Sequence, residues 1–187
     1  AFGQVTYNGN GNSGFGGTLG SGSFDVSDDG TTITFEFTRG GTGFYDALII
    51  YIDSESGGIN NTANLTDTGD GLRKGISGFD GTNRSTVNFP SGFTADHVIA
   101  GNVSTEDNIN FMGIWEIVES GSHTFTASAD ISSTTETDAT FSFTVDFSEL
   151  GISGTDNFSF VATYLNQDNA FRSDEGIGAV TASSNPG

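Results

Sequence analysis

Apolar and polar residues alternate along several short stretches of this chain, which is the pattern of strands with one buried face. In residues 31–38, isoleucine and phenylalanine alternate with threonine and glutamate. Residues 23–27 precede that run across the Asp-Asp-Gly turn at 28–30, so we predict a β-hairpin. Residues 139–147 alternate in the same way and predict another strand of the same kind.

The most apolar run is residues 44–53, whose β-branched and aromatic side chains predict a central strand that is covered on both faces. We expect a short strand at 72–77 and one helical turn at 148–151. Shorter apolar or alternating runs predict further strands at 4–7, 96–100, 110–119, 123–130 and 157–165.

These segments follow one another without intervening helical periods, and the 28 glycines and 2 prolines suit short strands joined by tight turns. We therefore predict an all-β fold, an antiparallel β-sandwich of the jelly-roll type. The 187 residues are expected to form a single domain. Its Gly/Asn-rich N-terminal segment, residues 1–22, is expected to contribute an edge strand or a strand exchanged between chains.

The chain is strongly acidic, with 24 Asp and Glu against 5 Lys and Arg and a formal net charge of −19. This charge repels the phosphates of nucleic acids and anionic membranes, so neither is an expected partner. It suits a neutral or cationic partner or a divalent cation. Alternatively, the charge only keeps an abundant extracellular protein in solution.

No stretch approaches the ~20 consecutive apolar residues of a membrane span, so we expect no membrane insertion. The sequence begins at Ala1 without a methionine or a leader, as a mature secreted chain does after signal cleavage, although a trimmed chain begins the same way. We expect a secreted protein that works outside the cell or at the cell surface.

Residue types that carry catalysis are scarce. The absence of cysteine excludes disulfides, thiolate metal sites and cysteine nucleophiles. A serine nucleophile is expected in a G-x-S-x-G turn, which the chain lacks, and its many carboxylates show no spacing that pairs two of them across a cleft. With only 2 histidines, we expect no enzyme.

Calcium is the expected cofactor, because it binds oxygen ligands of the kind that acidic loops supply. Four carboxylates bracket the polar loop after the central strand, namely Asp53, Glu55, Asp67 and Asp70. They do not follow the spacing of an EF-hand loop. The alternative reading is a solvated acidic loop without a metal.

Residues 24–38, 48–58 and 141–160 resemble the DOMON-like and family 9-type carbohydrate-binding β-sandwiches of secreted bacterial proteins. The resemblance covers roughly a third of the chain. It implies a jelly-roll sandwich that binds sugar or haem. Haem would need an axial Met or His pair, and the chain has no recognisable spacing for one. Sugar-binding members present Trp or Tyr rings, for which the candidates here are Trp115, Tyr7, Tyr45 and Tyr164.

Two functional hypotheses follow. The first is a non-enzymatic extracellular structural or adhesion module, a self-assembling surface, matrix or filament subunit whose sandwiches associate by strand addition or through terminal segments. The alternative is a secreted carbohydrate-binding module that recognises a neutral extracellular polysaccharide.

Overall fold

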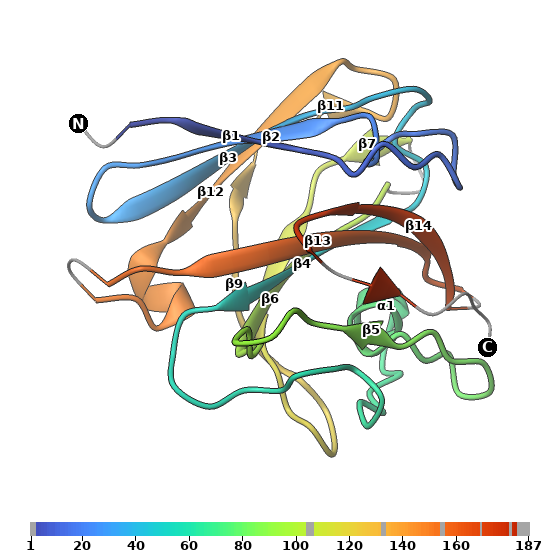
Figure 1. Cartoon of the computed structure of the whole chain (residues 1–187), viewed down its shortest axis with the longest axis vertical. Coiled ribbons are helices and arrows are strands. Elements are labelled where there is room, and N and C mark those ends of the chain that lie inside the picture. The colour runs from blue at the N-terminus through green and yellow to red at the C-terminus, as the bar shows by residue number, and fades with distance from the viewer. Residues whose placement is uncertain are drawn as a thin grey trace.

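Two antiparallel β-sheets pack face to face in this protein (Figure 1). The computed structural model describes residues 3–103, 107–131, 134–153, 156–168, 170–179 and 181–182. Within these residues the chain is mostly β-strand, and the predicted all-β antiparallel sandwich in one domain is confirmed.

The first sheet has the strand order β1-β2-β3-β12-β10, and the second has the order β14-β13-β4-β6-β8-β9. The strands of the first sheet are β1 (Val5–Asn8), β2 (Ser23–Asp28), β3 (Thr32–Thr38), β12 (Thr140–Asp146) and β10 (Asp130–Ile131). Those of the second are β14 (Phe171–Ile177), β13 (Ser159–Asn166), β4 (Ala47–Asp53), β6 (His97–Gly101), β8 (Met112–Glu116) and β9 (Thr124–Ser128).

Two short ladders and two helical elements complete the described structure. The ladders pair β11 (Thr134–Thr135) with β7 (Asn108–Ile109) and β15 (Thr181–Ala182) with β5 (Val87–Asn88). The helical elements are α1 (Gly71–Ser77) and the 3₁₀ turn η1 (Phe147–Leu150), which confirms the helical turn expected near residue 148.

Phenylalanine side chains fill much of the space between the two sheets. Phe24 of β2, Phe35 of β3 and Phe143 of β12 are at most 1% exposed. Phe35 and Phe143 face each other across the ladder and stack with ring centroids 5.2 Å apart. Strands β2, β3 and β12 thus bury every second residue, as their alternating sequences predicted.

The second sheet is covered on its outer face as well. Residues Ile49 and Tyr51 of β4 point outward into a second apolar cluster that α1 and β5 help to form, while Leu48 and Ile50 point into the space between the sheets. All four are 0% exposed. The prediction of a central strand covered on both faces is therefore confirmed.

The strand predicted at 72–77 is wrong, because this segment forms α1. The carboxylate of Asp70 accepts a hydrogen bond from the Arg73 N–H at 2.9 Å and caps the first turn. Gly78 ends the helix at a φ of 59°, a left-handed conformation that favours glycine. Leu72 and Ile76, four residues apart, place the buried face of α1 on the sheet.

Among the described residues, no helix combines the length and the apolar character needed to cross a membrane.

Candidate functional site

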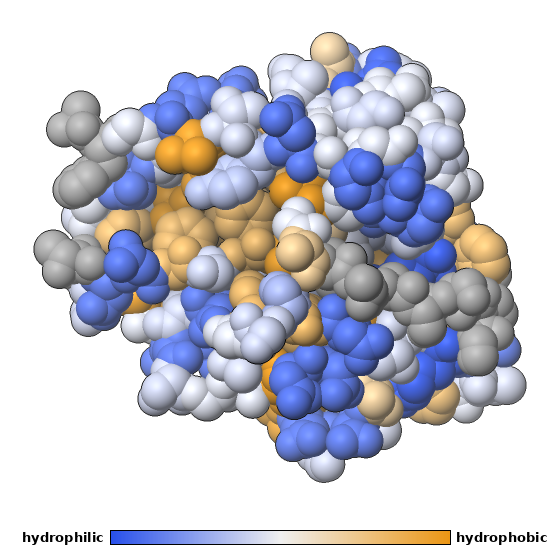
Figure 2. All heavy atoms as spheres, in the orientation of Figure 1, coloured by the Kyte–Doolittle hydropathy of each residue, from blue (hydrophilic) through white to orange (hydrophobic). Residues whose placement is uncertain are grey.

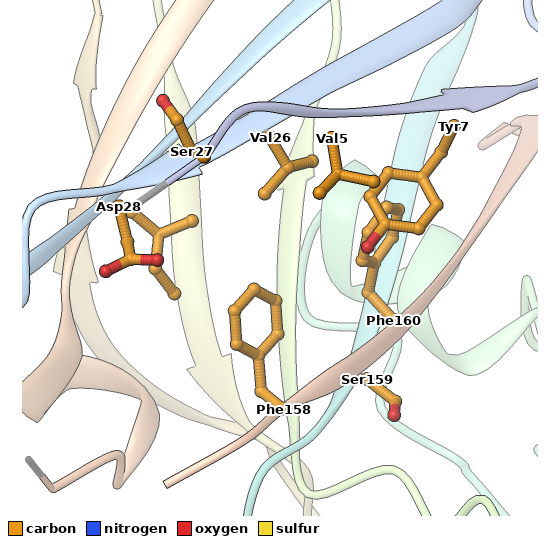
Figure 3. A pocket seen from close by; sticks show the side chains of 10 residues that line it. Val5, Tyr7, Val26, Ser27, Asp28, Phe158, Ser159 and Phe160 are labelled. Atoms are coloured by element: carbon orange, nitrogen blue, oxygen red, sulfur yellow. The ribbon is translucent and has the colours of Figure 1, made fainter. Parts of the chain in front are cut away.

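An apolar groove opens on the side of the sandwich where β1 lies. It has a volume of about 300 Å³ and is lined by β1, β2 and β3 on one wall and by the start of β13 on the other. Figure 2 shows apolar atoms gathered in this hollow. In Figure 3, Val5, Tyr7 and Val26 form one wall and face Phe158 and Phe160 on the other.

Both walls end in strand edges that have no partner in the described part of the chain. β1 pairs only with β2, and its open edge stops at Gly9, which forms a bridge with Ile177. On the other wall, β14 pairs with β13 only from Ala162 onward, so residues 159–161 pair with β4 alone. The two sheets meet at the Gly9–Ile177 bridge, and the groove is the gap beyond it.

The hydrogen-bond alternation of an antiparallel ladder identifies the free backbone groups of β1. The N–H of Gly9 donates to the carbonyl of Gly22 at 2.9 Å, so these two facing residues form a hydrogen-bonded pair. Bonded and non-bonded pairs alternate along such a ladder. Thr6, which faces Asp25, is therefore in a non-bonded pair, and its N–H and C=O point away from β2.

Two apolar side chains of β1 are exposed at the groove. Val5 and Tyr7 lie on the face of β1 that points toward the other sheet, yet they are 49% and 41% exposed. Among the described strands of the second sheet none covers them, and the ring of Phe160 meets that of Tyr7 edge-on with centroids 4.9 Å apart. The four residues of β1 carry no charge, whereas exposed edge strands in natural proteins are usually protected by charged residues.

On the other side of the bridge, the loop of residues 9–20 closes the edge of β14. Glu175 in β14 is 2% exposed, and its carboxylate accepts four backbone N–H groups at distances between 2.7 and 3.1 Å. The donors are Phe15, Gly17, Leu19 and Gly20. Hydrogen bonds to an ionised acceptor are stronger than neutral ones, so this carboxylate anchors the loop.

Sequence reasoning missed β14, although this strand decides where the groove ends. Its sequence, FRSDEGI, places Arg172 and Glu175 at buried positions, so no apolar alternation marks it. Hydrogen bonds satisfy both charged groups. The guanidinium of Arg172 donates to the hydroxyls of Ser85 and Thr163. The alternation of Val5 and Tyr7 with Gln4 and Thr6 marked a strand in the sequence, but it did not show that these side chains line a groove.

The four predicted sugar-binding rings lie in different environments. Trp115 and Tyr164 are 3% and 1% exposed, so neither offers a ring face to a ligand. The hydroxyl of Tyr164 accepts the backbone N–H groups of Tyr45 and Asp46, both at 2.9 Å, and burial raises its pKa. Tyr7 lines the groove. Tyr45 is 59% exposed, although its backbone N–H bonds to the buried Tyr164 hydroxyl.

Tyr45 presents an open ring face beside a small polar pocket. A Cβ built on Gly43 would lie 2.7 Å from Cζ of Tyr45, nearer than to Oη at 2.8 Å or Cε2 at 2.9 Å. A Cβ that approached in the plane of the ring would lie closer to Oη or Cε2 than to Cζ, so Gly43 packs against one face of the ring. Because the Tyr45 side chain is still 59% exposed, its other face is open. The adjoining pocket of about 60 Å³ is lined by polar side chains, among them Asp46, Asn102, Gln167 and Asp168.

The predicted calcium ligands are not brought together. Asp67 Oδ2 accepts the N–H of His123 at 2.7 Å and its Oδ1 that of Gly69, while Asp70 caps α1. At the end of β4, Asp53 accepts the N–H of Thr94, and Glu55 is exposed. Within the described ranges, no group of three or more His, Asp or Glu side chains has a metal-binding arrangement.

Ser77, His123 and Asp67 resemble a catalytic triad in composition, but their hydrogen bonds exclude that role. Nδ1 of His123 accepts the N–H of Val118 at 3.1 Å, so the ring proton of the neutral imidazole is on Nε2. Nε2 then donates to Ser77 Oγ at 3.1 Å and cannot take its proton. Burial lowers the pKa of His123, which favours this neutral form, and Ser77 is 0% exposed.

No protein-family model matches the chain, and no curated protein or solved structure is significantly similar to it. The resemblance to DOMON-like and family 9-type sandwiches therefore stays a prediction.

Proposed function

We propose that this chain is a non-enzymatic structural or adhesion module of the cell exterior that joins other chains by strand addition at the groove. The observation that carries the proposal is an uncharged edge strand, whose Thr6 N–H and C=O point away from β2, directly beside a groove lined by Val5, Tyr7 and Phe160. An added strand would gain backbone hydrogen bonds from the edge and place alternate side chains in the groove, which is a recurrent mode of peptide recognition.

The energy for such binding comes from apolar surface that the fold leaves open. Val5 and Tyr7 are about half exposed, and the walls formed by Phe158 and Phe160 are partly buried. Fully burying one aliphatic or aromatic side chain contributes roughly 1.5–3 kcal/mol. Two or three side chains inserted from a partner would therefore contribute roughly 3–9 kcal/mol toward the cost of ordering the bound segment.

The test uses a capped, uncharged peptide of about six alternating Val and Thr residues, titrated into the protein by calorimetry and by NMR of the backbone amides. Thr6→Pro removes the outward N–H without removing a backbone hydrogen bond between β1 and β2, although it also removes the hydroxyl that donates to Asp25. We expect it to weaken binding at least tenfold, the equivalent of about 1.4 kcal/mol, which is the range of one hydrogen bond.

Thr6→Val is the matched control, because it keeps the N–H and removes only the hydroxyl that donates to Asp25. Binding by this variant should resemble that of the natural chain. The proposal fails if no peptide binds, or if Thr6→Pro binds as well as Thr6→Val.

Self-assembly is one form of this function, and the native mass tests it. Light scattering after size separation, with and without calcium, would give particles well above the 19.4 kDa of one chain if copies associate. A calcium-dependent mass would support the predicted cofactor. A mass of 19.4 kDa in both conditions would exclude self-assembly, so that only a different protein could be the partner.

A second candidate function is binding of a neutral polysaccharide at Tyr45. The open ring face offers stacking to the apolar side of a sugar, and the amide and carboxylate groups beside it offer hydrogen bonds to hydroxyls. Affinity electrophoresis on neutral polysaccharides would show retention that Tyr45→Ala abolishes and Tyr7→Ala preserves. Equal retention of both variants would remove this site.

A further inference from the structure

We infer that the groove takes an extended segment of a different protein, with alternating apolar side chains and a basic residue at its carboxyl end, close to Asp28. This inference rests on the proposed strand addition and names the partner. It is carried by three features of the described residues: the charge at one end of the groove, the direction of the flanking strands, and the engagement of this chain's own basic residues.

Asp28 is the charged residue in the lining of the groove, and it lies at the end away from Tyr7 (Figure 3). Its Oδ1 accepts the N–H of Gly30 at 3.1 Å, and in the part of the chain that the structure describes its carboxylate forms no ion pair. Among the described residues, no Lys or Arg lines the groove. Its lining combines apolar side chains with Ser27 and Ser159, and the Asp28 carboxylate at one end has no basic partner in this part of the chain.

The two strands that flank the groove run in the same direction. β1 is antiparallel to β2 with Val5 opposite Val26, so the end of β1 that precedes Val5 lies toward Asp28. β13 starts at the same end, because Phe158 lies on the Asp28 side of Phe160 (Figure 3). An added strand that is antiparallel to both therefore brings its carboxyl end to Asp28, and antiparallel pairing is the more stable kind.

A second copy of this chain does not supply such a segment. Each copy carries a net charge of −19, so two copies repel each other. Arg172 is buried, Arg39 and Arg84 donate to backbone carbonyls, and Arg73 pairs with Asp67 and Asp70. The remaining basic residue, Lys74, lies in α1. The occupant that fits the charge is therefore a basic segment of another protein.

The experiment compares two capped peptides of identical composition, alternating Val and Thr, with a single Lys at the carboxyl end or at the amino end. Their equal net charge removes the general attraction of an acidic protein for a cation. We expect the peptide with the carboxyl-end Lys to bind about fivefold more tightly, the effect of one partly exposed ion pair. Asp28→Asn should abolish the difference, while its Oδ1 still accepts from Gly30.

Each other outcome overturns a defined part of the proposal. Equal binding of the two peptides overturns the assignment of Asp28 and of the strand direction but leaves strand addition intact. Tighter binding of a capped peptide that copies residues 4–9 of this chain would make a second copy the occupant. If none of the peptides binds, while the protein is folded by circular dichroism, strand addition itself fails.

Discussion

One side of the sandwich is built in two ways on either side of the Gly9–Ile177 bridge. On one side of the bridge, the edge of β14 is covered by the loop of residues 9–20, which a buried carboxylate holds in place. On the other side, β1 and the start of β13 diverge and leave an apolar groove between free strand edges. The loop and β1 both belong to the N-terminal segment. The loop lies against β14 and its Glu175 carboxylate, whereas Val5 and Tyr7 of β1 lie against the open groove.

The edge of β14 is closed by a specific anchor and not by the covering segment alone. Residues 9–20 are rich in Gly and Asn and have little apolar surface of their own, so their position depends on Glu175. Val5 and Tyr7 carry the apolar surface but meet no covering strand. The first region is therefore predicted to be sensitive to single substitutions, and the second to tolerate them.

The largest effect is expected from Glu175→Ala. The substitution leaves four backbone N–H groups of a buried loop without their acceptor, which should cost about 3–5 kcal/mol in the free energy of unfolding. Urea denaturation measures this, and hydrogen exchange should show lost protection at residues 15–20. Glu175→Gln, which keeps the side-chain volume and one acceptor oxygen, should lose less of the unfolding free energy than Glu175→Ala. A loss below about 1 kcal/mol for the alanine variant would show that the loop is held by other contacts.

A smaller effect is expected where side-chain amides fasten the same loop to β14. Nδ2 of Asn10 and Nδ2 of Asn12 both donate to the carbonyl of Asp174, at 2.8 and 2.9 Å. The double variant Asn10→Ala, Asn12→Ala should lose about 1–2 kcal/mol, since an exposed neutral hydrogen bond contributes about 1 kcal/mol at most. Thermal unfolding measures it. A loss as large as that of Glu175→Ala would contradict the central role of the carboxylate.

Acid should weaken the turn at the end of the open region. Hydrogen bonds from Thr32 and Thr31 lower the pKa of Asp29 to about 2. Because this is below the unfolded value near 4, the contribution of Asp29 to stability is complete above pH 4 and is lost as pH falls toward 2. The difference in Tm between the natural chain and Asp29→Ala should therefore shrink over that range. A difference that stays constant from pH 6 to pH 2 would contradict the assignment.

The smallest effect on stability is expected in the groove itself. Val5→Lys adds a charge to an exposed position and should change the free energy of unfolding by less than about 0.5 kcal/mol, while peptide binding is lost. Val26→Lys is the matched comparison, because Val26 lines the same groove but is 8% exposed and should lose about 2 kcal/mol or more. Equal losses of unfolding free energy for Val5→Lys and Val26→Lys would show that the groove is closed in solution.

Part of the fold could be predicted because its signals are local. The strands β2, β3 and β12 alternate clearly, and β4 is apolar throughout. The helix α1 also carried a local signal that the strand prediction overlooked, since Asp70 and Gly78 stand at its two ends as caps. The candidate site was predicted less well, because exposure of a ring depends on distant strands. Trp115 and Tyr164 are buried, while Tyr45 is open.

The sequence by itself determined the all-β class, the central strand and the inward face of each alternating strand, because side-chain period and turn residues are properties of neighbouring positions. Only the tertiary structure decided that β14 exists as a charged strand, since Glu175 and Arg172 find their partners at least 87 positions away in the chain or across a hairpin. It also decided that Val5 and Tyr7 line an open groove. Which inward-facing residues are covered depends on where the opposite sheet ends, and that boundary is set by packing between strands far apart in sequence.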